Sequence, residues 1–379
     1  MKYKLSEIAL FNPTETLKKG TLAKKVGMDK LQPFCRDIPD YEIAEFSGGM
    51  KFRNGDTIMA RITPCLENGK TAKVNILDTE EVGFGSTEYI VFRAIDGVTD
   101  EDYLYYLVCS PIVRDIAIKS MVGSSGRQRV QTDVVKGIEV ELPTLDEQRK
   151  IGSLLKILDD KIAVNNEINE NLEQQAQSLF IEMFDSKESN FWKQGVLSDI
   201  AEITMGQSPS GNSYNENGQG TVFFQGRAEF GFRFPTIRLF TSEPKRIAQK
   251  NDTLMSVRAP VGDLNVAHEE CCIGRGLAAI HSKDNHQSFV HYTMFSLQRE
   301  LDVFNGEGTV FGSINRNALN SMPIRVPPID LMDKFENIAS PIDKLIRTNF
   351  DKNCHLQAIR DSILPKLMAG EIDLSNFKL

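Results

Sequence analysis

The sequence predicts an α+β fold: two globular domains in tandem repeat, separated by two long antiparallel coiled-coil helices with pseudo-twofold symmetry. Three observations predict it. A pattern of segments occurs twice along the 379 residues, an apolar heptad seam occurs twice, and each seam contains a pair of asparagines. A chain of this length can form two or three domains with a sizeable core.

The repeat is visible in strand-like segments and in prolines. NGDTIMARITP ends at Pro64 and KNDTLMSVRAP ends at Pro260, and each joins an Asp-Thr-apolar-Met strand pattern to a proline loop. LSEIAL and LSDIAEI stand near the starts of the two halves. GIEVELPTLDEQRKI contains Pro143 and SMPIRVPPIDLMDKF contains Pro327, 184 residues later. We therefore expect two domains built on one plan.

A heptad seam follows each of these two prolines. Apolar positions alternate in steps of four and three, which predicts two helices of roughly 40 residues and about 60 Å each. The first seam is Ile151, Leu155, Leu158, Ile162, Asn165, Asn169, Leu172, Ala176, Leu179 and Met183. The second, 184 residues on, is Phe335, Ala339, Ile342, Ile346, Asn349, Asn353, Leu356, Arg360, Ile363 and Leu367. Long helices could join any two domains, but unrelated helices would not share one seam at one offset.

The asparagines predict that the two helices pair with each other. In an antiparallel pair Asn165 faces Asn353 and Asn169 faces Asn349, whereas in a parallel pair Asn165 faces Asn349. Asparagine meets asparagine in both cases, so the polar layer specifies register but not direction. The antiparallel pair brings together the two ends of the second domain, as compact domains often require. A solvated kink or an interface with another chain is the alternative role for these residues.

The expected organisation is a first domain (1–143), a central long helix (144–190), a second domain (191–327) and a C-terminal long helix (328–379). Short strand patterns such as YIVFRA and LAAIHS alternate with short helices and with Gly-, Ser- and Asn-rich loops, which is typical of an α+β domain.

Arg and Gln recur in the loops, and these side chains suit contacts with DNA bases and phosphates. GSSGRQRV lies as far before Pro143 as GTVFGSI lies before Pro327. Any single Arg could instead form a structural ion pair or lie solvated on the surface. The candidates for contact with DNA are Arg61, Arg127, Gln128, Arg129, Gln225, Arg227, Arg233, Arg258 and Arg275.

No catalytic or metal-binding pattern stands out. ENGKT resembles the end of a phosphate loop, but Pro64 occupies the position where that motif needs its first glycine. His281, His286 and His291 are five residues apart, which does not place them on one helix face, so they are expected to be structural. The six scattered cysteines indicate reduced thiols. With no apolar run of about 20 residues, we expect a cytoplasmic protein. The net charge of −8 excludes a uniformly basic nucleic-acid binder but not a local basic surface.

The chain resembles the specificity (S) subunit of type I restriction–modification systems. The resemblance rests on the segment from Pro143 to Phe180 and its repeat, on LQAIRDSILPKLMAGEIDL near the C-terminus, and on ITMGQSPSGNSYN with FFQGRAEF. It covers essentially the whole chain. GSSGRQRV and GTVFGSI align only with a shift, which weakens the transfer of roles to single residues.

The resemblance implies that the globular parts are target recognition domains, each reading half of a bipartite, asymmetric DNA site, and that the helix pair sets the spacer. It implies a non-catalytic chain that binds no cofactor and docks two adenine methyltransferase (M) subunits, which bind S-adenosylmethionine. Restriction (R) subunits are further partners where a system carries a nuclease. A two-domain protein scaffold without DNA specificity, or an enzyme with an unrecognised site, remains an alternative at this stage. The target sequence depends on loop geometry and DNA deformation and cannot be read from the chain.

Overall fold

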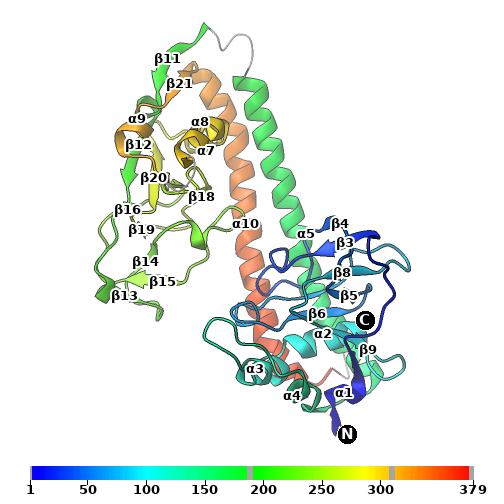
Figure 1. The fold of residues 1–379 in the computed structure, drawn as a ribbon. Coiled ribbons are helices and arrows are strands. Elements are labelled where there is room, and N and C mark those ends of the chain that lie inside the picture. The colour runs from blue at the N-terminus through cyan, green and yellow to red at the C-terminus, as the bar shows by residue number, and fades with distance from the viewer. Residues whose placement is uncertain (1, 186–190, 307–311, 375–379) are drawn as a thin grey trace. The chain divides into compact units, whose positions relative to one another are not determined.

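Two helices of 40 residues each dominate the computed structural model, which describes residues 2–185, 191–306 and 312–374 (Figure 1). They are α5 (Leu145–Phe184) and α10 (Ile329–Met368). Their first residues are 184 positions apart, and so are their last. The predicted repeat of a long helix at this offset is therefore confirmed. None of the described helices is long and apolar enough to cross a membrane.

The chain divides into two compact units, and each long helix contributes one part to each unit. The first unit comprises residues 1–166 and 351–379, and the second comprises residues 167–350. The cores explain this division. The first unit's core takes in Leu155 near the start of α5 and Leu364 near the end of α10. The second unit's core takes in Phe180 near the end of α5 and Phe335 near the start of α10.

Two four-stranded sheets and a strand pair form the globular part of the first unit. The strand orders are β2-β9-β6-β7, β4-β3-β8-β5 and β1-β10. Neighbouring strands are antiparallel, except that β3 and β8 are parallel. The elements are β1 (Lys2–Lys4), α1 (Leu5–Ile8), β2 (Ala9–Phe11), β3 (Leu22–Val26), β4 (Glu42–Glu45), β5 (Met50–Phe52), β6 (Thr57–Ala60), β7 (Thr71–Lys73), β8 (Gly83–Gly85), β9 (Tyr89–Ala94), α2 (Glu101–Cys109), α3 (Pro111–Lys119), α4 (Thr132–Lys136) and β10 (Glu139–Glu141).

The second unit repeats this sheet topology. Its orders are β12-β20-β17-β18, β13-β15-β14-β19-β16 and β11-β21, and β14 and β19 are again parallel. Strand β13 extends the second sheet by one. The α+β tandem repeat is confirmed. The elements are β11 (Lys193–Val196), α6 (Leu197–Ile200), β12 (Ala201–Met205), η2 (Gly211–Ser213), β13 (Tyr214–Asn215), β14 (Thr221–Phe224), η3 (Arg227–Glu229), β15 (Leu239–Thr241), β16 (Ile247–Ala248), β17 (Thr253–Ser256), β18 (Leu264–Val266), β19 (Cys271–Ile273), β20 (Leu277–Ser282), α7 (Gln287–Ser296), α8 (Gln298–Asp302), η4 (Val303–Asn305), α9 (Arg316–Asn320) and β21 (Pro323–Val326).

The repeated Asp-Thr pair starts an equivalent buried strand in each unit. Asp56 accepts a hydrogen bond from the backbone N–H of Arg53 (2.8 Å), and Asp252 accepts one from that of Gln249 (2.8 Å). Each carboxylate thus closes the turn that leads into β6 or β17. Because all four residues of both strands are buried, the repeat is part of the domain core.

In the first unit, the long helices run antiparallel. The Asn165 amide donates to the side-chain oxygen of Asn353 (2.7 Å), and Arg360 pairs with Asp159 (2.7 Å). The residue number of the paired side chain therefore rises along α10 as it falls along α5. Arg360, a seam position, is buried, and the second oxygen of Asp159 accepts the hydroxyl of Tyr106 (2.7 Å).

The second unit pairs its helix segments in the same direction. The Asn349 amide donates to the side-chain oxygen of Asn169 (2.9 Å), and the rings of Phe180 and Phe335 lie 5.5 Å apart. The antiparallel direction that chain geometry predicts is confirmed within each unit. All four asparagines are buried, so a shift in register would leave their amides without partners.

We predict that Asn349→Leu lowers the free energy of unfolding by about 1–3 kcal/mol, because the buried oxygen of Asn169 loses its donor. The double variant Asn169→Leu/Asn349→Leu should recover most of that loss, since two apolar side chains leave no amide unsatisfied. Urea unfolding of the full chain measures both. A double variant that loses the sum of the two single effects would contradict this account.

Candidate nucleic-acid interface

Three loops of the first unit converge beside the end of β6. The backbone N–H of Arg61 donates to the carbonyl of Glu88 (2.9 Å), and that of Thr63 donates to the carbonyl of Gln128 (3.0 Å). The N–H of Val130 donates to the carbonyl of Arg61 (2.8 Å). The proline loop, the turn before β9 and the GSSGRQRV loop are thus joined through their backbones.

The second unit joins its equivalent loops by the same kind of contact. The N–H of Ala259 donates to the carbonyl of Gly312 (3.0 Å), and that of Ile314 donates to the carbonyl of Val257 (3.1 Å). Isolated bridges pair Ile62 with Arg129 in one unit and Arg258 with Ser313 in the other. Residues 308–311 of the GTVFGSI segment lie outside the described residues.

Arg275 and Gln225 belong to the same loop cluster of the second unit. The N–H of Gly276 donates to the carbonyl of Gln225 (3.3 Å), and that of Val257 donates to the carbonyl of Gly276 (2.9 Å). The two sequence segments FFQGR and CIGRGL, about 50 residues apart in the chain, therefore lie side by side next to the residue that precedes Arg258.

The candidate side chains of the first unit differ in what holds them. Arg127 is exposed and Gln128 half-buried. The guanidinium of Arg129 donates hydrogen bonds to the carboxylate of Glu88. Its Nε lies 2.9 and 3.0 Å from Oε1 and Oε2, and its Nη2 lies 2.7 Å from Oε1. This pairing holds the pKa of Glu88 below its usual value. Arg61 is half-buried, and its Nε has no hydrogen-bond partner in the described chain.

In the second unit, four of the five candidates are exposed. Gln225, Arg258 and Arg275 present their side chains to solvent from the joined loops. Arg227 is also exposed and forms an ion pair with Asp263, which follows the proline loop. The structure thus gathers these four residues on one loop cluster.

Arg233 is the exception, because it is buried in an ion-pair network. Its guanidinium contacts Glu173 (2.7 Å) and Asp343, and Asp343 also accepts the hydroxyl of Tyr292 (3.0 Å). Burial and two carboxylates give Arg233 a structural role in the second unit. Its guanidinium is not accessible to a nucleic acid.

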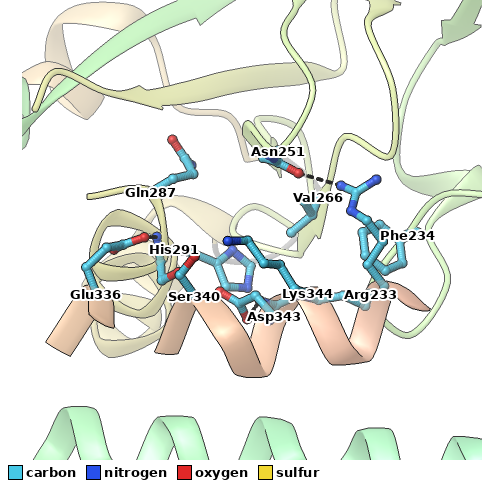
Figure 2. Close-up of a pocket in the computed structure, with 12 residues that line it drawn as sticks. Arg233, Phe234, Asn251, Val266, Gln287, His291, Glu336, Ser340, Asp343 and Lys344 are labelled. Carbon is cyan, nitrogen blue, oxygen red and sulfur yellow. Dashed lines mark hydrogen bonds and ion pairs between the residues drawn. The ribbon is translucent and has the colours of Figure 1, made fainter. Parts of the chain in front are cut away.

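A cavity of about 100 Å³ lies next to Arg233 (Figure 2). His291 lines it, fully buried, with Nδ1 3.1 Å from the Thr253 hydroxyl and with Nε2 unpartnered among the described residues. Burial lowers the pKa of His291 well below its usual value, which leaves a neutral imidazole. Glu336 also lines the cavity and accepts the first N–H groups of α7 from Ser288 (3.2 Å) and Phe289 (3.1 Å).

The other two histidines predicted to be structural have separate acidic partners. His281 contacts Asp252 (2.6 Å) and His286 contacts Asp333 (2.8 Å). Among the described residues, no group of His, Cys, Asp and Glu could hold a metal ion.

Two acidic residues of the loop clusters were not identified from the sequence. Glu88 and Asp263 each hold an arginine, and their partners lie 41 and 36 residues away in the chain. The only local signal for Glu88 was its turn position directly before the buried strand β9.

Close backbone approach explains the glycines of the second unit's loop cluster. A Cβ built on Gly206 would lie 2.1 Å from the carbonyl oxygen of Gly274, and one on Gly276 would lie 2.9 Å from that of Gln225. The Gly206 N–H donates to the carbonyl of Leu277 (2.9 Å). These loops can pack together only because side chains are missing at these points.

Comparison with known proteins gives a consistent result. The family model described as the type I restriction modification DNA specificity domain matches residues 1–174 and 190–356. A Methanocaldococcus jannaschii protein named as the proposed specificity subunit of the type I restriction enzyme MjaX is 30% identical over 372 residues, 92% of this chain and 84% of that protein. The MjaIX specificity subunit of the same organism is 25% identical over 314 residues, 73% of this chain and 70% of that protein.

A solved structure shares the fold. The type I restriction-modification S subunit from M. genitalium matches with a TM-score of 0.58 and 14% identity, covering 97% of this chain and 95% of that one. At this identity the match shows the fold alone.

We predict that Gly206→Ala lowers the free energy of unfolding of the chain by about 1–3 kcal/mol, because the new methyl group would meet backbone that must shift. Gly211→Ala is the matched control. It has nothing within 4 Å of the added carbon and should stay within about 0.5 kcal/mol of the parent. Thermal unfolding compares the two, and equal effects would show that the close approach is not limiting.

Proposed function

We propose a function from one premise: the chain belongs to the family of type I restriction–modification DNA specificity subunits. Subunits of this family recognise DNA and assemble with methyltransferase and restriction subunits, and they are not themselves catalytic. We propose that each globular part of this chain reads one half of a bipartite DNA site. The observation that carries this is the pair of equivalent loop clusters, each joined by backbone hydrogen bonds and each presenting Arg and Gln side chains.

The two half-sites should differ in sequence. The loops are joined at equivalent backbone positions, but Arg129 in the first unit corresponds to Ser313 in the second. The second cluster carries Gln225, Arg227 and Arg275, and the first carries Arg61, Arg127 and Gln128. Two loop clusters with different donors and acceptors select different bases, so the complete site is asymmetric.

The long helices are assigned two roles. Their register is fixed by buried amides, so they can set a constant unread gap between the half-sites. Their outer faces dock the methyltransferase. On α10, Ile338 and Leu345 are seven residues apart and expose 49% and 45% of their surface. On α5, Ile157 and Val164 are likewise exposed and seven apart. Such spacing forms one apolar stripe along a helix.

Adenine methylation is then the work of the partner. We assign S-adenosylmethionine to the methyltransferase and two methyltransferase copies to one chain, because the docking helices occur twice. Partner subunits also supply much of the phosphate neutralisation, which reconciles DNA binding with a net charge of −8. We place the complex in the cytoplasm, where it marks host DNA and, with a restriction subunit, acts in defence against phages.

The test is affinity purification of the tagged full chain from its source cells, followed by mass spectrometry. We expect an adenine methyltransferase at about two copies per chain. Genome-wide mapping of N6-methyladenine should then show a bipartite motif that disappears when the gene is deleted. Recovery of no nucleic-acid enzyme, or methylation unchanged by the deletion, would contradict the proposal.

We predict that Leu345→Glu reduces recovery of the methyltransferase at least tenfold, because a charge would be buried in the docking stripe. The stability of the chain itself should change by less than about 0.5 kcal/mol, since the position is exposed. Asn337→Glu is the control: it is exposed on the same helix, about 100° around the axis from Ile338. Equal loss in both variants would argue against a docking stripe at these residues.

A further inference from the structure

The ion pair between Glu88 and Arg129 engages one edge of the guanidinium and leaves another edge open. Glu88 takes Nε–H and one hydrogen of Nη2. A guanidinium has five N–H donors. The two on Nη1 and the second on Nη2 make no hydrogen bond to the described part of the chain. They form a planar fork at the tip of a side chain that is 46% exposed.

Backbone contacts fix both ends of this pair. The N–H and carbonyl of Arg129 exchange hydrogen bonds with Val122 (2.9 and 3.0 Å). The carbonyl of Glu88 accepts the N–H of Arg61, and its own N–H donates to the Ser86 hydroxyl (3.1 Å). Both residues of the ion pair are therefore held in place before DNA binds, which reduces the conformational entropy lost on binding.

A neutral base edge suits this fork better than a phosphate does. Glu88 carries a negative charge beside Arg129, so the pair has no net charge and would release few counterions from DNA. The O6 and N7 atoms of guanine are two neutral acceptors at the spacing of an Arg fork, and this is the commonest base-specific contact in the major groove. Adenine offers a donor at the position of O6 and would not match.

At the position of Arg129, the described residues of the second unit offer no such fork. The isolated bridges place Ser313 where the first unit has Arg129. A guanine contact from this loop position is thus expected in the first half-site only.

We propose that Arg129 reads the guanine of one G·C pair in the half-site of the first domain, and that Glu88 is the positioning residue that presents its fork. This inference rests on the proposed function. Glu88→Gln would keep the size of the side chain but lose the carboxylate that accepts the hydrogen bonds of Arg129. Arg129→Lys would keep the charge but lose the planar fork.

The experiment uses the full chain with its methyltransferase in cells, on a plasmid library in which both half-sites are randomised one position at a time. Sequencing of N6-methyladenine gives the preference at each position. We expect one position of the first half-site to favour G·C by about 5- to 150-fold, the range of a bidentate base contact. Glu88→Gln and Arg129→Lys should each reduce that preference to a few-fold while leaving the second half-site unchanged.

Glu42→Gln is the matched control. Glu42 is exposed and pairs with Lys25 (3.2 Å) on strands outside the loop cluster, so its removal should leave every position unchanged. The inference is overturned if the first half-site contains no G·C preference, or if that preference survives in both Glu88→Gln and Arg129→Lys. A parent complex with no sequence-dependent methylation would instead overturn the proposed function.

Discussion

Buried amide pairs set the register of the long helices, and the remaining packing depends on that register. An apolar seam alone tolerates a shift of one heptad, because leucine and isoleucine knobs fit many holes. A shift would separate Asn165 from Asn353 in one unit and Asn169 from Asn349 in the other, leaving buried amides without partners. The same shift would withdraw Leu364 or Phe335 from the core of its unit. Register and core packing thus reinforce each other.

The two units share a backbone framework and differ in the side chains placed on it. Equivalent strands start at a buried Asp-Thr pair, and equivalent bridges join the proline loop to the loop that contains Arg129 or Ser313. The framework uses backbone groups, which any residue supplies, so loop side chains can change without loss of the fold. A constant backbone with variable loop side chains suits a protein in which one fold must present two different sets of base contacts.

Much of this architecture could be predicted from the sequence because it is periodic or repeated. The 184-residue offset, the seam and the antiparallel direction required only spacing and chain geometry. The partners of the arginines could not be predicted, since Glu88 and Asp263 lie far from Arg129 and Arg227 in the chain and no period connects them. Arg233 shows the same limit. It lies in the same short segment as the exposed Gln225 and Arg227, yet tertiary packing buries it between Glu173 and Asp343.

We propose that ion pairing of the loop arginines separates affinity for DNA from sequence specificity. Arg129 and Arg227 each face a carboxylate, which cancels charge that would otherwise attract any phosphate backbone. On the proposed function, an acidic chain whose arginines are neutralised binds non-specific DNA weakly, while the ion pairs restrict the orientation of each guanidinium. Arg127, Arg258 and Arg275 are exposed, and we propose that they contact phosphates. On this proposal, discrimination among sequences resides in this chain and the bulk electrostatic attraction comes from the subunits that join it. Tight binding then requires both assembly and the correct sequence.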